Sequence, residues 1–127
     1  MNKKPIGLGM IDIFNASPSL QTKIQQAVNE RSLLQLVIRH IRSYEFSTKV
    51  DSDEIDIAFA ATGGMTRWVN SDNLKIKCEP MPNRQTTFGD ILIEQPQGYV
   101  NLATPAGFIP LVDVVYSLGQ LSLKQMN

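Results

Sequence analysis

The spacing of apolar residues changes along the chain, from helical in the first third to alternating further on. Between residues 18 and 43 apolar side chains recur every three or four positions, as on one helix face: Leu20, Ile24, Ala27, Leu34, Ile38 and Ile41. After residue 54 the spacing is typical of short strands separated by turns rich in Gly, Pro and Asn. This change predicts an α+β fold, in which a long N-terminal helix packs on an antiparallel meander sheet of roughly four to six strands.

Two residues indicate where the helix begins. Ser17 has a hydroxyl that accepts from free helix amides, and Pro18 loses nothing at a first helical position because it has no amide hydrogen. The downstream end leaves two interpretations. Either one helix runs from residue 18 to about residue 43, or it breaks near Asn29 and restarts at Ser32, whose spacing to Gln35 matches a capping box. We favour the single helix.

Short apolar runs predict the strands. Leu74, Ile76 and Cys78 alternate with charged residues, so one face of this strand should be buried and the other solvated. The alternation from Ile6 to Met10 also suits a strand. The connections are short, which implies antiparallel neighbours. The predicted strands are Ile55 to Ala60, Met65 to Val69, Leu74 to Glu79, Ile91 to Glu94 and Tyr99 to Thr104.

The C-terminal segment fits either a helix or a strand. Apolar residues after Pro110 step by three and four positions as far as Leu121, which favours a helix. A strand from Phe108 to Val115 competes, because it would pair with Tyr99 to Thr104 through the turn at Pro105 to Gly107. We favour the helix.

Length and composition fit a single domain over residues 1–127. The chain is 43% hydrophobic, which suffices for one core at this length. It contains no run of 18 apolar residues, so no membrane span is expected. Its one cysteine, Cys78, cannot form an internal disulfide and fits a reducing compartment. We therefore expect a cytoplasmic protein.

Charge is balanced overall but divided between the two parts of the chain. Twelve basic residues match twelve acidic ones. Residues 1–50 carry seven basic and three acidic side chains, net +4, whereas residues 51–127 carry five and nine, net −4. Such a division can help the halves dock or steer a second copy head to tail.

The chain offers few groups for catalysis. His40 and Cys78 are its one histidine and one cysteine, and such a pair would suit nucleophilic catalysis. However, Cys78 falls on the predicted buried face, where a thiol behaves as a small hydrophobe. Arg39 and Arg42 flank His40 and would oppose its protonation. We therefore predict no catalytic residues and favour a non-enzymatic function.

Metal-binding and nucleotide-binding patterns also fail. The acidic run at residues 51–56 has Asp56 where a calcium loop needs Gly, and Thr62 where it needs Glu. The run from Thr62 to Gly64 lacks the lysine of a phosphate loop and predicts a hairpin turn instead. We predict neither a metal nor a cofactor. The remaining carboxylates are expected to face solvent: Glu79, Asp90, Glu94 and Asp113.

Arginines and the single tryptophan are the strongest candidates for contacts with a partner, since Arg and Trp are enriched at interface hot spots. The polar segment from Asn83 to Thr87 has the composition of a contact loop. The candidate interaction surface comprises Arg39, Arg42, Arg67, Trp68 and Arg84.

These observations favour a small non-enzymatic protein-interaction module, such as an adaptor, an inhibitor, an immunity protein or a chaperone. Its expected partner is another protein or a second copy in a homodimer. The first alternative is a small-ligand or nucleotide binder with a pocket between helix and sheet. The second is a binder of RNA or single-stranded DNA that uses the helix cations, which the zero net charge disfavours.

Overall fold

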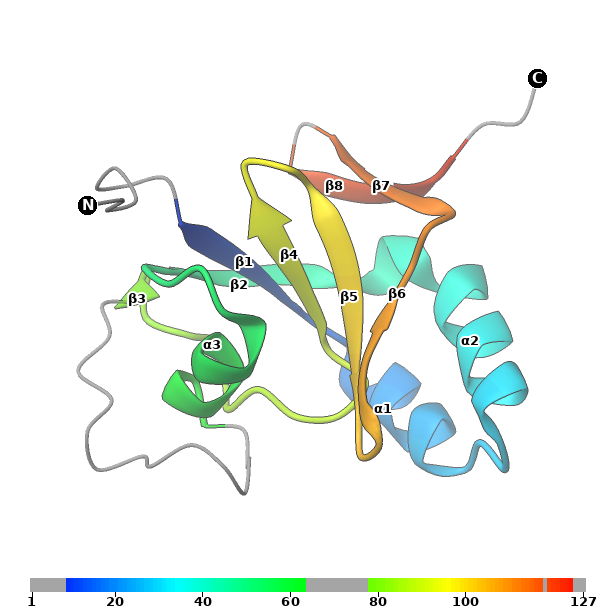
Figure 1. Cartoon of the computed structure of the whole chain (residues 1–127). Coiled ribbons are helices and arrows are strands. Elements are labelled where there is room, and N and C mark those ends of the chain that lie inside the picture. The colour runs from blue at the N-terminus through cyan, green and yellow to red at the C-terminus, as the bar shows by residue number, and fades with distance from the viewer. Residues whose placement is uncertain (1–8, 64–77, 118, 125–127) are drawn as a thin grey trace.

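The computed structural model describes residues 9–63, 78–117 and 119–124. Six strands form an antiparallel sheet in the order β3-β2-β1-β4-β5-β6, and β7 and β8 form a separate hairpin (Figure 1). The predicted α+β class with an antiparallel sheet is therefore confirmed. The elements are β1 (Met10–Asn15), α1 (Pro18–Gln25), α2 (Glu30–Arg39), the 3-10 helix η1 (Ile41–Ser43), β2 (Glu45–Val50), α3 (Ile55–Ala61), β3 (Cys78–Glu79), β4 (Ile91–Gln95), β5 (Tyr99–Thr104), β6 (Gly107–Pro110), β7 (Val114–Ser117) and β8 (Gln120–Leu123).

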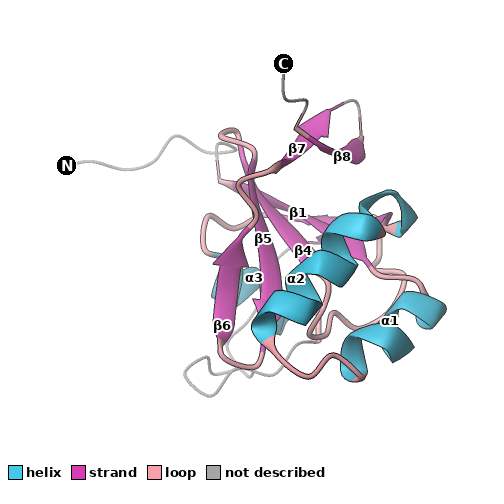
Figure 2. Ribbon diagram, turned by 90° about the vertical axis from the view of Figure 1, so that its right-hand side faces the viewer, coloured by secondary structure: helices cyan, strands magenta, loops and turns pink. Residues whose placement is uncertain are grey.

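The sheet is covered on both faces. Figure 2 shows α1 and α2 on one side of the sheet and α3 behind it on the other. Phe14 of β1 belongs to the core under α1, α2 and the hairpin. Its neighbour Ile13 belongs to the core under α3. Successive residues of a strand point to opposite faces, so β1 contributes apolar side chains to the cores on both sides of the sheet.

The prediction of one long helix is wrong. Helix α1 ends at Gln25, and α2 begins at Glu30 after an extended Asn29. The Asn29 side chain accepts from the Ser32 amide at 2.8 Å, and this local bond competes with a continuous helix. A break near Asn29 was the alternative interpretation, although the N-cap of the second helix is Asn29 and not Ser32. The start is confirmed, because Ser17 accepts from the Leu20 amide at 3.3 Å.

The run from Ile55 to Ala60 forms helix α3, so the strand predicted there is wrong. Ala58 and Phe59 are buried and Ile55 packs beside them, which is the i, i+3, i+4 spacing of a helix face. A short apolar run between turns does not distinguish a buried strand from one helical face. Here the packing of Ala58 and Phe59 against the sheet selects the helix.

The C-terminal segment consists of strands, so the favoured helix is wrong. β6 pairs with β5, with Thr104 opposite Gly107, as the alternative interpretation expected, but β6 ends at Pro110 and does not continue to Val115. β7 and β8 then form a hairpin, and Gly119 at φ +79 lies in its turn. Glycine takes this conformation without a steric penalty, which explains why the turn replaces a helix here.

β4 and β5 confirm the strands predicted at Ile91 to Glu94 and Tyr99 to Thr104. β2 was not predicted, since four of its six residues are polar. Residues 1–8 and 64–77 lie outside the described part, and with them the predicted strand at Met65 to Val69 and most of the two at Ile6 to Met10 and Leu74 to Glu79. Among the described residues, no helix has both the length and the apolar character needed to cross a membrane.

Candidate functional site

A groove of about 620 Å³ lies where the end of α2 and η1 meet the hairpin. Arg39, His40 and Arg42 line it from the helical side. Val115 and Leu123 line it from β7 and β8. We refer to these five residues as the basic groove. It combines cations with apolar side chains, as interfaces commonly do.

Local structure explains why the two arginines point outward. Helix α2 ends at Arg39, and the Ser43 amide donates to the His40 carbonyl at 2.9 Å as the chain tightens into η1. Ile41 is buried and anchors η1 to the core, so Arg42 beside it faces solvent. Arg39 in the last helical turn also interacts favourably with the helix dipole.

The hairpin supplies the apolar side of the groove. Val114 and Leu121 are buried beneath it, while Val115 and Leu123 are 39% and 46% exposed. Tyr116 packs edge to face on Phe14, with 5.5 Å between ring centroids, and so attaches the hairpin to the sheet. The exposed apolar pair is therefore held by a rigid support.

Arg84 lies elsewhere, in a buried network around Asp90. Asp90 is fully buried and accepts from Arg84 at 2.7 and 2.8 Å, from the Ala16 amide at 2.9 Å and from the Thr87 amide at 2.9 Å. Asn15 donates to the same carboxylate at 3.2 Å. The prediction that Asp90 faces solvent is therefore wrong. Its carboxylate can be buried because the Arg84 charge and the amide donors replace its hydrogen bonds to water.

The other hydrogen bonds of Arg84 complete its engagement. Its guanidinium also donates to the carbonyls of Ala16 at 2.9 Å and Gln85 at 2.7 Å. With the two bonds to Asp90, the hydrogens of both terminal nitrogens are used. Arg84 therefore connects segments of the chain, and its charge is compensated within the molecule.

The predicted surface residues thus fall into separate groups. Arg39 and Arg42 share the basic groove. Arg84 belongs to the Asp90 network. Arg67 and Trp68 lie outside the described residues. Sequence reasoning missed the contribution of Val115 and Leu123, because the favoured interpretation of the C-terminal segment was a helix and not the hairpin of β7 and β8.

His40 and Cys78 are not brought together. His40 follows α2 at the start of η1, whereas Cys78 pairs with Val50 at the far end of β2. Partial burial raises the pKa of the Cys78 thiol, which disfavours the nucleophilic thiolate.

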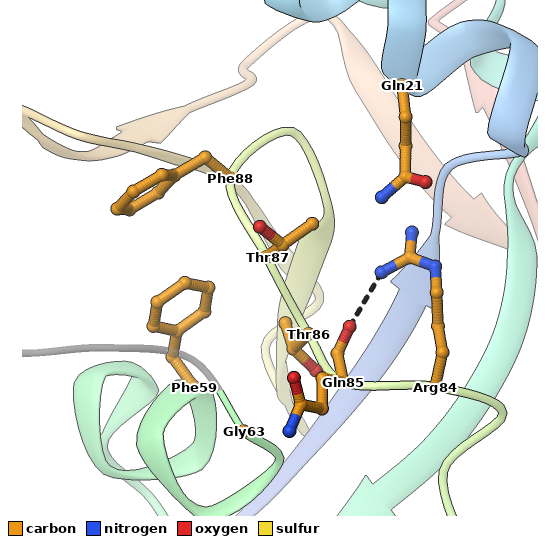
Figure 3. Close-up of a pocket in the computed structure, with 8 residues that line it drawn as sticks. All are labelled: Gln21, Phe59, Gly63, Arg84, Gln85, Thr86, Thr87 and Phe88. Carbon is orange, nitrogen blue, oxygen red and sulfur yellow. Dashed lines mark hydrogen bonds between the residues drawn. The ribbon is translucent and has the colours of Figure 1, made fainter.

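A second cleft of about 470 Å³ lies beside α3 (Figure 3). Phe59 and Phe88 stack on one side of it, with 5.8 Å between their ring centroids. Gln21, Gln85 and Thr87 also line it. An aromatic wall with a few amide and hydroxyl groups is typical of small-molecule pockets.

Tyr44 lies next to the Asp90 network and leads to a prediction about alkaline stability. Its hydroxyl donates to the Gly89 carbonyl at 2.7 Å. Burial, and then the charge of Asp90, raise its pKa well above the ordinary 10.0. Above about pH 10 the unfolded chain therefore loses a proton that the folded chain keeps, and stability should fall by about 1.4 kcal/mol per pH unit from this group.

The Tyr44→Phe variant should show a shallower alkaline decline in the free energy of unfolding, measured by urea titration from pH 8.5 to 11. It should also be less stable by about 1 kcal/mol at neutral pH, because the hydrogen bond is lost. Burial also raises the pKa of Tyr116, so some slope remains in the variant. Equal slopes for the two proteins would contradict the assignment to Tyr44.

Comparison with protein families, curated proteins and solved structures found no match for the chain.

Proposed function

We propose that the protein is a non-enzymatic interaction module that associates with further copies of itself through the basic groove. The observation that carries this proposal is the combination of exposed Arg39 and Arg42 with exposed Val115 and Leu123 in one groove. Neither guanidinium forms an ion pair with any residue that the structure describes. Both charges are therefore open to a partner, and the apolar pair loses contact with water when one binds.

The edge at β6 is a poor alternative contact. Just beyond the end of β6, the Leu111 amide donates to the Val100 carbonyl and so points toward β5. Backbone amides along a strand point alternately to either side, so the backbone nitrogens of Phe108 and Pro110 face the open edge. Pro110 has no amide hydrogen to donate. Proline on an edge strand opposes extension of a sheet by a second chain. Association through side chains of the basic groove is therefore favoured over sheet extension.

Replacement of Arg39 and Arg42 by glutamine should weaken self-association about tenfold, because two solvent-exposed ion pairs are lost. Sedimentation velocity over a range of protein concentrations measures the effect. Lys23→Gln/Arg31→Gln is the matched control, since it removes the same charge from exposed sites on α1 and α2.

The control variant should associate like the unmodified protein. A monomer at every concentration up to tens of micromolar would overturn the proposal of self-association. Association that is unchanged in the Arg39→Gln/Arg42→Gln protein would overturn the assignment to the basic groove. Monomeric protein whose retention on single-stranded DNA depends on these arginines would favour nucleic acid instead.

The cleft in Figure 3 favours a small ligand as the second candidate function. Its volume and its Phe59 and Phe88 wall suit a planar organic molecule with polar edges. A thermal-shift screen with nucleosides should raise the melting temperature of the unmodified protein but not of Phe88→Ala. Phe88 is partly exposed, so this substitution preserves most of the core. No shift with any nucleoside would count against this ligand class.

A further inference from the structure

We infer that the copies associate head to tail, with the basic groove of one copy receiving the acidic turn at residues 51–56 of the next. This inference rests on the proposed self-association and specifies its geometry. The acidic turn contains Asp51, Asp53, Glu54 and Asp56, and it is the densest group of carboxylates in the chain. Its charge is opposite to that of Arg39 and Arg42, so the two surfaces are electrostatically complementary.

Two carboxylates of the acidic turn, those of Asp51 and Glu54, are accessible on a fixed support. Asp51 and Glu54 are exposed. Glu54 stands at the N-cap position of α3 without a side-chain hydrogen bond to the helix. The Ser52 amide donates to the Val50 carbonyl at 2.9 Å, and the Glu54 amide donates to the Ser52 hydroxyl at 3.2 Å. The backbone of the turn is thus preorganised, which lowers the entropy lost on binding.

The two surfaces lie at opposite ends of β2. Figure 1 shows β2 running from η1, beside α2, to the turn that leads into α3. A strand of six residues separates its ends by roughly 17–20 Å. A single copy therefore cannot neutralise its own basic groove with its own acidic turn.

The two surfaces also belong to different sides of the sheet. The basic groove is built on α2 and the hairpin, whereas the acidic turn begins α3, which covers the opposite face (Figure 2). A two-fold dimer centred on the groove would place Arg39 and Arg42 against themselves, which is repulsive. Because the groove and the acidic turn lie on opposite sides of the sheet, one two-fold interface cannot contain both of them. The contact between them is therefore heterologous, and heterologous contacts build rings or chains larger than a dimer.

The test uses two variants, each of which removes one of the surfaces. Arg39→Gln/Arg42→Gln neutralises the basic groove, and Asp51→Asn/Glu54→Gln reduces the charge of the acidic turn. All four side chains are exposed, so both variants should fold, which circular dichroism checks. The unmodified protein should form species larger than a dimer in low salt, and these should dissociate in high salt.

Each variant alone should associate about tenfold more weakly than the unmodified protein. An equimolar mixture of the two variants should instead form a 1:1 complex that does not grow with concentration. The intact groove of one variant binds the intact turn of the other, and the remaining groove and turn carry the substitutions and cannot bind a third copy. Sedimentation velocity distinguishes these species, and native mass spectrometry gives their composition.

The outcomes separate this inference from the proposed function. If the unmodified protein is monomeric, both the proposed self-association and the head-to-tail arrangement are wrong. An unmodified protein that stops at a dimer, or a mixture in which the variants stay apart, overturns the head-to-tail arrangement and leaves self-association standing. Asp51→Asn/Glu54→Gln protein that assembles like the unmodified chain shows that the acidic turn is not the occupant of the groove.

Discussion

The Asp90→Ala variant is expected to lose about 3–5 kcal/mol of unfolding free energy. The substitution removes the anion that neutralises Arg84 and leaves the Ala16 and Thr87 amides without their acceptor. Asn15 loses its side-chain partner as well. Urea unfolding at neutral pH, followed by circular dichroism, measures the loss.

A double-mutant cycle with Arg84→Met tests the pairing itself. Arg84→Met alone leaves the Asp90 carboxylate buried with its amide donors only, so it should also be strongly destabilising. The double variant should lose clearly less unfolding free energy than the two single variants lose together, because it leaves no unpaired charge buried. Additive losses would show that the two side chains act independently.

The Phe14→Ala variant should also lose about 3–5 kcal/mol, because it opens a cavity in the core beneath the hairpin. Phe14 is almost completely buried and contacts Phe46 and Tyr116 edge to face, at 5.7 and 5.5 Å between ring centroids. Thermal unfolding by calorimetry measures the loss.

Phe46→Ala is the matched control, since this ring makes the same kind of contact but is 36% exposed. Phe46→Ala should lower the unfolding free energy by about 1 kcal/mol, because one aromatic contact and part of the buried apolar surface are lost. Similar losses for both phenylalanines would contradict the central position of Phe14.

Parts of the fold with strong local signals were predicted from the sequence. Ser17 and Pro18 marked the start of α1, because capping depends on a few adjacent residues. β4 and β5 were predicted because turn residues bound their apolar runs. The failures share one cause. At Ile55 to Ala60 and after Pro110, the same residues satisfy both a helical and a strand pattern, and distant contacts choose between them.

The candidate site shows the same limit. Arg39 and Arg42 were identified from local charge, and the structure places them in one groove. The apolar side of that groove depends on a hairpin that the C-terminal pattern did not predict. The role of Asp90 was also inaccessible, because the Ala16 amide lies 74 positions away in the chain. Hydrogen bonds between residues far apart in the sequence cannot be predicted from the spacing of neighbouring residues.

The order of strands has a consequence for how the chain is made. β1 precedes every other strand that the structure describes, yet it lies inside the sheet between β2 and β4. Until β4 at Ile91–Gln95 has emerged from the ribosome, one edge of β1 stays open and its apolar faces are only partly covered. A nascent or truncated chain that stops before this point displays a hydrophobic strand ready to pair with a neighbouring molecule. Fragments that end before β4 should therefore aggregate, whereas the complete sheet pairs β1 on both edges.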